Sequence, residues 1–168
     1  MDALARARAL VENVTPLKTD CGKRCGAACC QADQEGDNGM LLFPGEERYY
    51  ENADWCRLIP HEQTGSYLLV CGGSCPRENR PLACRIFPLL TLPEGKIKLD
   101  IRAWPVCPLM PYGRRGLDED FVSAVKEASR LLWTDETQKP FLYKLEAMMN
   151  EYRQLSQLME EPKGDRHV

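Results

Sequence analysis

Cysteine is the residue type in this chain most capable of specific chemistry, because nine cysteines occur among its 168 residues and most are closely spaced. One group runs from Cys21 to Cys30. A second begins with Cys71-Gly-Gly-Ser-Cys75 and continues to Cys84. Thiols at this density either pair as disulfides or bind metal ions, and the redox compartment usually decides between the two. The sequence therefore points to structural cross-links or to metal binding by thiolates.

The N-terminal residues favour metal binding. Asp2, Arg6 and Arg8 interrupt the apolar stretch that a secretory signal peptide needs, and no segment approaches the ~18 apolar residues of a membrane span. We therefore expect a cytoplasmic protein, in which thiols stay reduced and a patterned set of cysteines holds metal. An odd count of nine cysteines also fits poorly with complete disulfide pairing.

Length and charge set broader bounds. The formal net charge of −3 gives no reason to expect nucleic acid or an anionic membrane as a partner. The length fits one domain, or one domain with an extension. A chain of this size buries about two thirds of its unfolded surface, so a metal ion is not strictly needed for folding.

The first cysteine group cannot bind one ion as a straight helix. Zinc held by four thiolates is tetrahedral, with Zn–S distances near ~2.3 Å and neighbouring sulfurs ~3.8 Å apart. Cys21, Cys25 and Cys29 recur at every fourth position, which would span about 12 Å of a helix. The glycines of this segment let the backbone turn, so we expect a loop around metal. The adjacent Cys29 and Cys30 point in different directions and suit two neighbouring metals, unless one of them is a structural thiol.

The second group has similar chemistry. Cys71 and Cys75 are separated by three residues, within the gap of common zinc knuckles, and Cys84 follows. Arg80 and Arg85 lie beside these cysteines in the sequence. They are candidates to donate hydrogen bonds to thiolate sulfur, the alternative being solvated arginines or surface ion pairs.

The remaining candidates have weaker claims. His61 lies in a polar Pro60-His-Glu-Gln63 segment, where a lone histidine is more often exposed to solvent than bound to metal. His167 lies in the polar C-terminal tail and is a weaker candidate still. Cys56 is expected to be the spare thiol.

These motifs carry a family resemblance. Cys25-Gly-Ala-Ala-Cys29-Cys30 followed by Cys75-Pro-Arg-Glu-Asn-Arg-Pro-Leu-Ala-Cys84-Arg-Ile-Phe-Pro88 resembles the YkgJ-type cysteine-cluster family. The resemblance covers roughly residues 19–108, with Cys107 matching the late cysteine of that family. It implies a zinc- or iron-chelating domain related to the cluster of flagellin lysine N-methylase. That family usually has two residues between its first cysteines, against three here, and either Cys56 or Cys71 can match its middle cysteine, of which we prefer Cys71.

The sequence therefore predicts a metal-binding protein that holds zinc or iron, including an iron–sulfur centre as one form. Zinc would make it a structural or binding module, whereas iron–sulfur would permit electron transfer or substrate activation. The division of the cysteines between one site and two stays open. The predicted metal ligands are Cys21, Cys25, Cys29, Cys30, Cys71, Cys75, Cys84 and Cys107.

An enzyme is the alternative function. The resemblance implies an S-adenosylmethionine-dependent protein lysine methyltransferase, or an accessory factor of one. The sequence lacks a glycine-rich nucleotide loop, and its first cysteines miss the radical S-adenosylmethionine spacing by one residue. Thiol catalysis lacks support, since Cys-x3-Cys is not the redox Cys-x2-Cys motif. We therefore favour a function without catalysis.

The elements that must position these residues predict an α+β fold. An amphipathic helix with Leu4, Leu10 and Val11 as its apolar positions begins the chain. A strand at 66–70 would deliver Cys71, and strands at 87–92 and 96–102 would form a β-hairpin. The fold is expected to be small, irregular, cysteine-rich and stapled by metal.

The C-terminal part has a different composition. Residues 1–113 are expected to form the cysteine-cluster domain, 114–160 a helical hairpin, and 161–168 a disordered tail. The hairpin helices, at 117–133 and from Pro140 onward, carry apolar stripes. We expect these stripes to pack on the cysteine-rich part, the alternative being a surface for self-association or for a protein partner.

Overall fold

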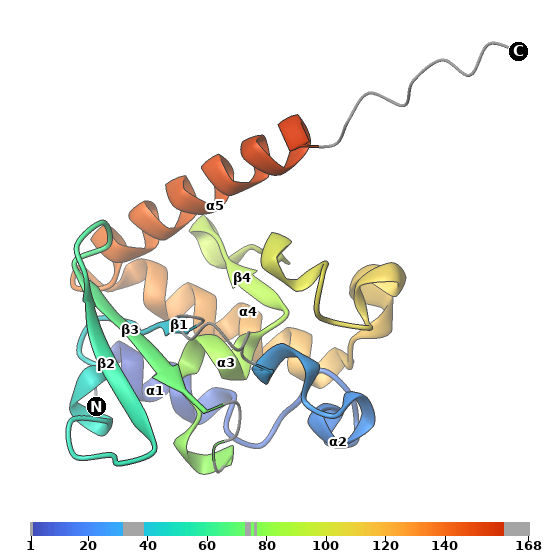
Figure 1. Cartoon of the computed structure of the whole chain (residues 1–168), viewed down its shortest axis with the longest axis horizontal. Coiled ribbons are helices and arrows are strands. Elements are labelled where there is room, and N and C mark those ends of the chain that lie inside the picture. Colours follow the sequence, from blue (N-terminus) through green and yellow to red (C-terminus); the bar gives the residue numbers. More distant parts are fainter. Residues whose placement is uncertain (1, 32–38, 73–74, 76, 160–168) are drawn as a thin grey trace, which may run out of the picture.

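The computed structural model describes residues 2–31, 39–72, 75 and 77–159. It combines helices with antiparallel strands, which confirms the α+β class (Figure 1). The predicted disordered tail at 161–168 lies outside the described residues. The α-helices are α1 (Ala3–Leu10), α2 (Cys21–Cys25), α3 (Leu82–Ile86), α4 (Glu119–Thr134) and α5 (Lys139–Met159). The strands are β1 (Met40–Leu41), β2 (Cys56–His61), β3 (Ser66–Cys71), β4 (Leu89–Thr91) and β5 (Ile97–Leu99).

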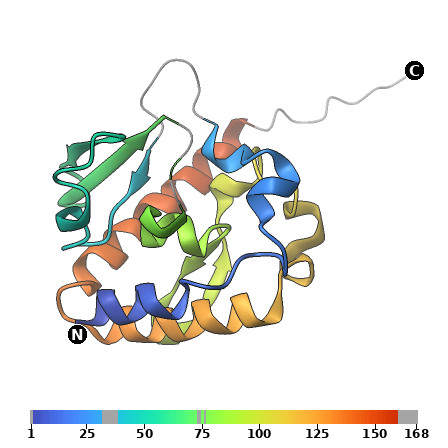
Figure 2. The same ribbon diagram turned by 90° about the horizontal axis from the view of Figure 1, so that it is seen from below.

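The N-terminal helix forms where it was predicted. Asp2 caps the first turn of α1, and the helix packs along α4 (Figure 2). Leu4 and Val11 are buried, as predicted, but Leu10 is 38% exposed. Ala7, which follows Leu4 by three positions, takes the buried place instead.

The larger sheet has the strand order β1-β3-β2, so β3 is central and β2 is an edge strand. The predicted strand at 66–70 is confirmed as β3, which ends at Cys71. Its partner β2 was not predicted, because Arg57 and Pro60 interrupt the alternation of apolar residues. An edge strand tolerates proline. The antiparallel register places Cys56 directly opposite Cys71.

The smaller sheet is the predicted β-hairpin. Strands β4 and β5 pair antiparallel, and a short 3-10 turn at Pro93–Gly95 connects them. The second arm ends earlier than predicted. Asp100 accepts a hydrogen bond from the Arg102 N–H at 2.9 Å, which caps a 3-10 helix at Ile101–Ala103.

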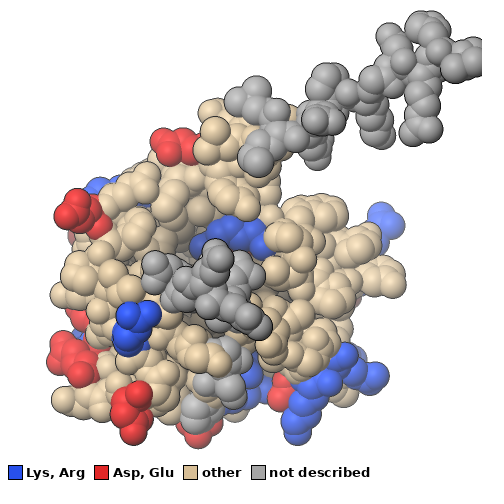
Figure 3. Space-filling view, in the orientation of Figure 1, with Lys and Arg blue, Asp and Glu red and all other residues tan. Residues whose placement is uncertain are grey.

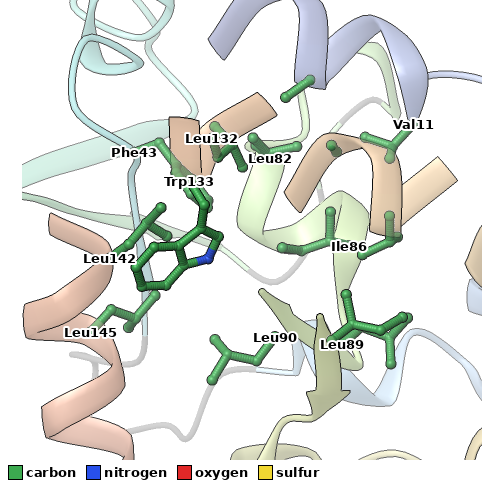
Figure 4. Close-up of a cluster of buried hydrophobic side chains, with 14 of the residues drawn as sticks. Val11, Phe43, Leu82, Ile86, Leu89, Leu90, Leu132, Trp133, Leu142 and Leu145 are labelled. Carbon is green, nitrogen blue, oxygen red and sulfur yellow. The ribbon is translucent and has the colours of Figure 1, made fainter. Parts of the chain in front are cut away.

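A single hydrophobic cluster joins the N-terminal and C-terminal parts (Figure 4). It spans both sides of the predicted boundary at 113/114. Phe43 and Phe141 pack within it with ring centroids 5.3 Å apart. Other members include Val11, Leu82, Ile86, Leu89, Leu90, Leu132, Trp133, Leu142 and Leu145.

Helices α4 and α5 meet at the turn of residues 135–138 and diverge from it (Figures 1 and 2). Asp118 caps α4 by accepting hydrogen bonds from two backbone N–H groups. The apolar stripe of α5 is buried as far as Met149, whereas Tyr152 is 44% and Leu155 60% exposed. The last part of α5 therefore extends beyond the core. No helix in the described part of the chain has both the length and the apolar character needed to cross a bilayer.

Candidate metal centre

A cavity of about 290 Å³ lies where the cysteine-bearing segments converge. It lies among the chain that follows α1, α2, the 3-10 helix at Ala28–Cys30, α3 and the chain around Cys107. The cavity brings together six of the eight predicted ligands from three separate segments: Cys21, Cys25, Cys29, Cys30, Cys84 and Cys107. Cys71 and Cys75 do not line it.

The first cysteine group is a broken helix. Asp20 starts α2 by accepting a hydrogen bond from the Gly22 N–H at 3.0 Å. Gly26 and Ala27 then both adopt left-handed backbone conformations, with φ of 62° and 55°. Two such residues in succession reverse the chain between Cys25 and Cys29. The segment is therefore not one straight helix, but it is not the expected loop either, because Cys21–Cys25 is α-helix and Ala28–Cys30 is 3-10 helix.

Cys29 and Cys30 lie side by side, with their Sγ atoms 3.9 Å apart. A hydrogen bond from Cys29 lowers the pKa of Cys30 to about 6, against the effect of burial and with help from the Arg80 charge. The same interaction raises the pKa of Cys29. The pair therefore loses its first proton at a lower pH than an isolated thiol would, and keeps its second proton to a higher pH.

Cys84 lies on the short helix α3 and faces several other thiols. Burial raises its pKa well above the usual value, and the nearby charges of Cys30, Cys75 and Cys71 add to the rise. Burial and the charge of Cys71 likewise raise the pKa of Cys75. These effects show an electrostatic interaction among three thiols: Cys71, Cys75 and Cys84. Two of them, Cys71 and Cys75, do not line the cavity.

A second neighbourhood forms around Cys21. Burial raises its pKa, and the charges of Cys25 and Cys107 contribute to the rise. Burial also raises the pKa of Cys107, again with a contribution from Cys25. The Cys25 thiol donates a weak hydrogen bond to the Cys21 carbonyl oxygen at 3.4 Å. Cys21, Cys25 and Cys107 therefore form a second group of interacting thiols.

Four arginines line the same cavity: Arg24, Arg77, Arg80 and Arg85. Among the described residues, the buried Nε of Arg80 has no hydrogen-bond partner, and its charge acts on Cys30 and Cys75. Arg85 instead donates to the Arg80 and Glu78 carbonyl oxygens at 2.8 and 2.7 Å. Basic side chains also occupy a hollow near the centre of the face in Figure 3. Of the two arginines predicted to donate to thiolates, Arg80 keeps a free donor, whereas Arg85 donates to backbone carbonyl oxygens.

Sequence reasoning missed the carboxylate that fixes α3. Glu46 is fully buried and pairs with Arg8 of α1. Its carboxylate also accepts hydrogen bonds from the Leu82 N–H at 2.6 Å and the Phe43 N–H at 3.2 Å. Leu82 is the first residue of α3, so Glu46 anchors the helix that carries Cys84. A glutamate in the Glu46-Glu47 pair gave no sequence signal for this role.

His61 and Cys56 lie away from the cavity. The Nδ1 atom of His61 is 2.9 Å from the Thr64 hydroxyl, within the turn that joins β2 and β3. Cys56 begins β2 and has Cys71 as its cross-strand neighbour. Neither residue lines the cavity.

The thiols lie near one another, but they are not arranged as the ligands of a metal ion. Within residues 2–31, 39–72, 75 and 77–159, no three cysteine, histidine or carboxylate side chains converge on a single metal position. All nine cysteines are free thiols. Protonated thiols have no reason to adopt the spacing that a metal ion imposes on thiolates, since binding requires their deprotonation.

Comparison with known proteins identifies no relative. No protein-family model matches the chain, and no curated protein or solved structure matches it significantly. The resemblance to the YkgJ-type family therefore stays a prediction from the cysteine motifs.

Proposed function

We propose that this protein binds two metal ions, zinc or iron, through the thiolates of its eight predicted ligands. The observation that carries the proposal is the cavity where six cysteines from three separate segments meet. Partly exposed thiols without a common role have no cause to gather from positions as distant in the chain as Cys21 and Cys107. Metal binding supplies such a cause, because thiolate is the ligand type that zinc and iron sites share.

The interactions among the thiols support a division into two sites. Cys21, Cys25 and Cys107 form one group, and Cys71, Cys75 and Cys84 form the other. Cys29 interacts with a member of each group, Cys21 and Cys84, whereas Cys30 interacts with Cys75 and Cys84. One member of the pair would complete four ligands in each group, the number that a tetrahedral thiolate site needs.

The charge balance also favours metal-bound thiolates. Four thiolates around a divalent ion leave a net charge of about −2 on each site. The Arg80 guanidinium interacts with Cys30 and Cys75, and its unpartnered Nε is a further donor for such a thiolate. Hydrogen bonds of this kind orient the ligand and tune the metal. The proposal also requires a compartment that keeps thiols reduced, as the cytoplasm does.

Cobalt substitution tests the proposal. Reduced, metal-free protein is titrated with Co²⁺ without oxygen, and the thiolate charge-transfer and d–d absorption bands are followed. We expect tetrahedral thiolate bands that saturate at two equivalents. Cys84→Ser and Cys107→Ser should each lose one equivalent, because they belong to different groups.

Cys56→Ser is the matched control, since Cys56 is the cysteine left out of the eight proposed ligands. It should retain both equivalents. Wild-type protein without thiolate bands would contradict metal binding. Equal loss from all three variants would contradict the assignment of ligands.

A further inference from the structure

Cys56 has a structural partner that the metal proposal does not use. Strands β2 and β3 pair in a register that sets Cys56 directly opposite Cys71. Residues directly opposite each other in an antiparallel pair project to the same face. Both side chains indeed pack against the cluster of Leu42, Tyr50 and Leu69. Burial raises the pKa of Cys56, and the charge of Cys71 adds to the rise, so the two sulfurs are near each other.

The geometry of this pair is close to that of a disulfide. Directly opposed residues have Cβ atoms roughly 4.5–5.5 Å apart, and a disulfide needs roughly 3.5–4.5 Å. The difference is a movement of about one ångström, which β2 can make as an edge strand bound to the sheet on one side only. The adjacent Cys29 and Cys30 are less suitable, because their Cα atoms are about 3.8 Å apart and disulfides usually need at least about 4.4 Å.

Both thiols are within reach of a small oxidant. Cys56 and Cys71 are each only partly buried. The charge of Cys71 also acts on Cys75 and Cys84. Cys71 therefore interacts both with Cys56 and with the thiols to which the second metal site is assigned.

We propose that Cys56 and Cys71 form a cross-strand disulfide on oxidation by a peroxide, and that this bond removes Cys71 from the metal site. The disulfide stands on the strand register alone, whereas its effect on metal rests on the proposed function. Cys56 is then a resolving thiol rather than a spare one.

The reaction balances with hydrogen peroxide as the oxidant. One sulfur attacks the peroxide, whose O–O bond breaks, and gives a sulfenic acid and one water. The second sulfur displaces the sulfenic oxygen, which leaves as a second water and forms the S–S bond. The thiol pair loses two electrons to the peroxide, and both thiol protons end in water.

The first arm of the test uses metal-free protein. Reduced protein is treated with hydrogen peroxide, free thiols are blocked with N-ethylmaleimide, and tryptic peptides are mapped by mass spectrometry. We expect a disulfide between the peptides of residues 49–57 and 58–77. The second peptide also contains Cys75, so fragmentation between Cys71 and Cys75 must locate the bond. Cys75→Ser should retain the link and Cys56→Ser should lose it.

The second arm uses protein loaded with Zn²⁺ and follows the release of zinc to a chromophoric chelator. Wild-type protein should release one equivalent several-fold faster than Cys56→Ser at the same peroxide concentration. Pairing of Cys71 with another cysteine in the first arm would overturn the disulfide. Equal release rates would overturn its effect on the metal. Protein that forms the disulfide but binds no zinc would contradict the proposed function and leave the disulfide standing.

Discussion

At the scale of single residues, the candidate metal ligands could be predicted from the sequence, but the residues that hold them in place could not. Spacing and residue type indicated Cys21 and Cys84 as ligands, because thiols are rare and their patterning is visible. Glu46 was invisible to the same reasoning, since a glutamate in a polar segment is normally solvated. Its role depends on α1 and α3, which approach it only in the folded chain.

Glu46 gives the clearest prediction at this scale. Glu46→Gln replaces one carboxylate oxygen by an amide NH2 group, which even in its better orientation faces the Phe43 N–H, and leaves the Arg8 guanidinium and the Leu82 N–H on a neutral carbonyl. We expect the free energy of unfolding to fall by about 3–5 kcal/mol, because a buried charge is left without its partner. Urea unfolding measures this change.

Glu127→Gln is the control. Glu127 forms an exposed ion pair with Arg130 at 2.9 Å, and such pairs contribute at most about 1 kcal/mol. If both variants had the stability of the wild-type protein, the anchoring role of Glu46 would be wrong.

At the scale of secondary-structure elements, periodic segments were predicted well and short irregular ones were not. Helices α1, α4 and α5, strand β3 and the β4–β5 hairpin follow from apolar periodicity and turn residues. Helix α3 was missed because five residues carry too little periodicity, and β2 because Pro60 and Arg57 obscure its alternation. Helix α3 carries Cys84, so the place of this thiol in the site could not be predicted from the sequence.

The reversal between α2 and the following 3-10 helix depends on Gly26. Its φ is +62°, and no atom lies within 4 Å of where a Cβ would be, so backbone strain alone opposes a side chain. Gly26→Ala should lower the free energy of unfolding by about 1–2 kcal/mol and weaken cobalt binding.

Gly72→Ala is the matched control for this prediction. Gly72 also has open space around its Cβ position, and its φ lies outside the left-handed region. This variant should stay within about 0.5 kcal/mol of the wild-type protein. Equal stability of the two variants, measured by urea unfolding, would contradict the strained reversal.

Helix α4 is tied to the β4–β5 hairpin by a buried hydroxyl. Ser129 donates to the carbonyl oxygens of Leu92 and Lys96, at 3.2 and 3.1 Å. Ser129→Ala should cost about 1–2 kcal/mol in thermal or urea unfolding, because it leaves buried carbonyls with fewer donors. Ser123→Ala, on the exposed face of the same helix, should have no measurable effect. A Ser129→Ala protein as stable as Ser123→Ala would show that this contact is not stabilising.

At the scale of the whole molecule, the hydrophobic core and the thiol-lined cavity are largely separate. The main cluster of buried apolar residues contains no cysteine, and it joins α1 to α4 and α5. The length of the chain already indicated that folding does not strictly need metal.

This separation predicts how the protein responds to a chelator. Metal removal from loaded protein should lower the melting temperature, since binding free energy is lost from the native state. The far-ultraviolet circular dichroism at 20 °C should change little, because the core stays packed. Loss of most helical signal at that temperature would instead show that metal holds the whole fold together.

The most direct test of the central claim is the metal content of the untreated protein. The chain is purified without oxygen, and zinc, iron and acid-labile sulfide are quantified per chain. The proposed function predicts two equivalents of metal, with sulfide present only if the metal is iron. Protein that retains no metal under these conditions, and takes up none when zinc or iron is supplied, would contradict it.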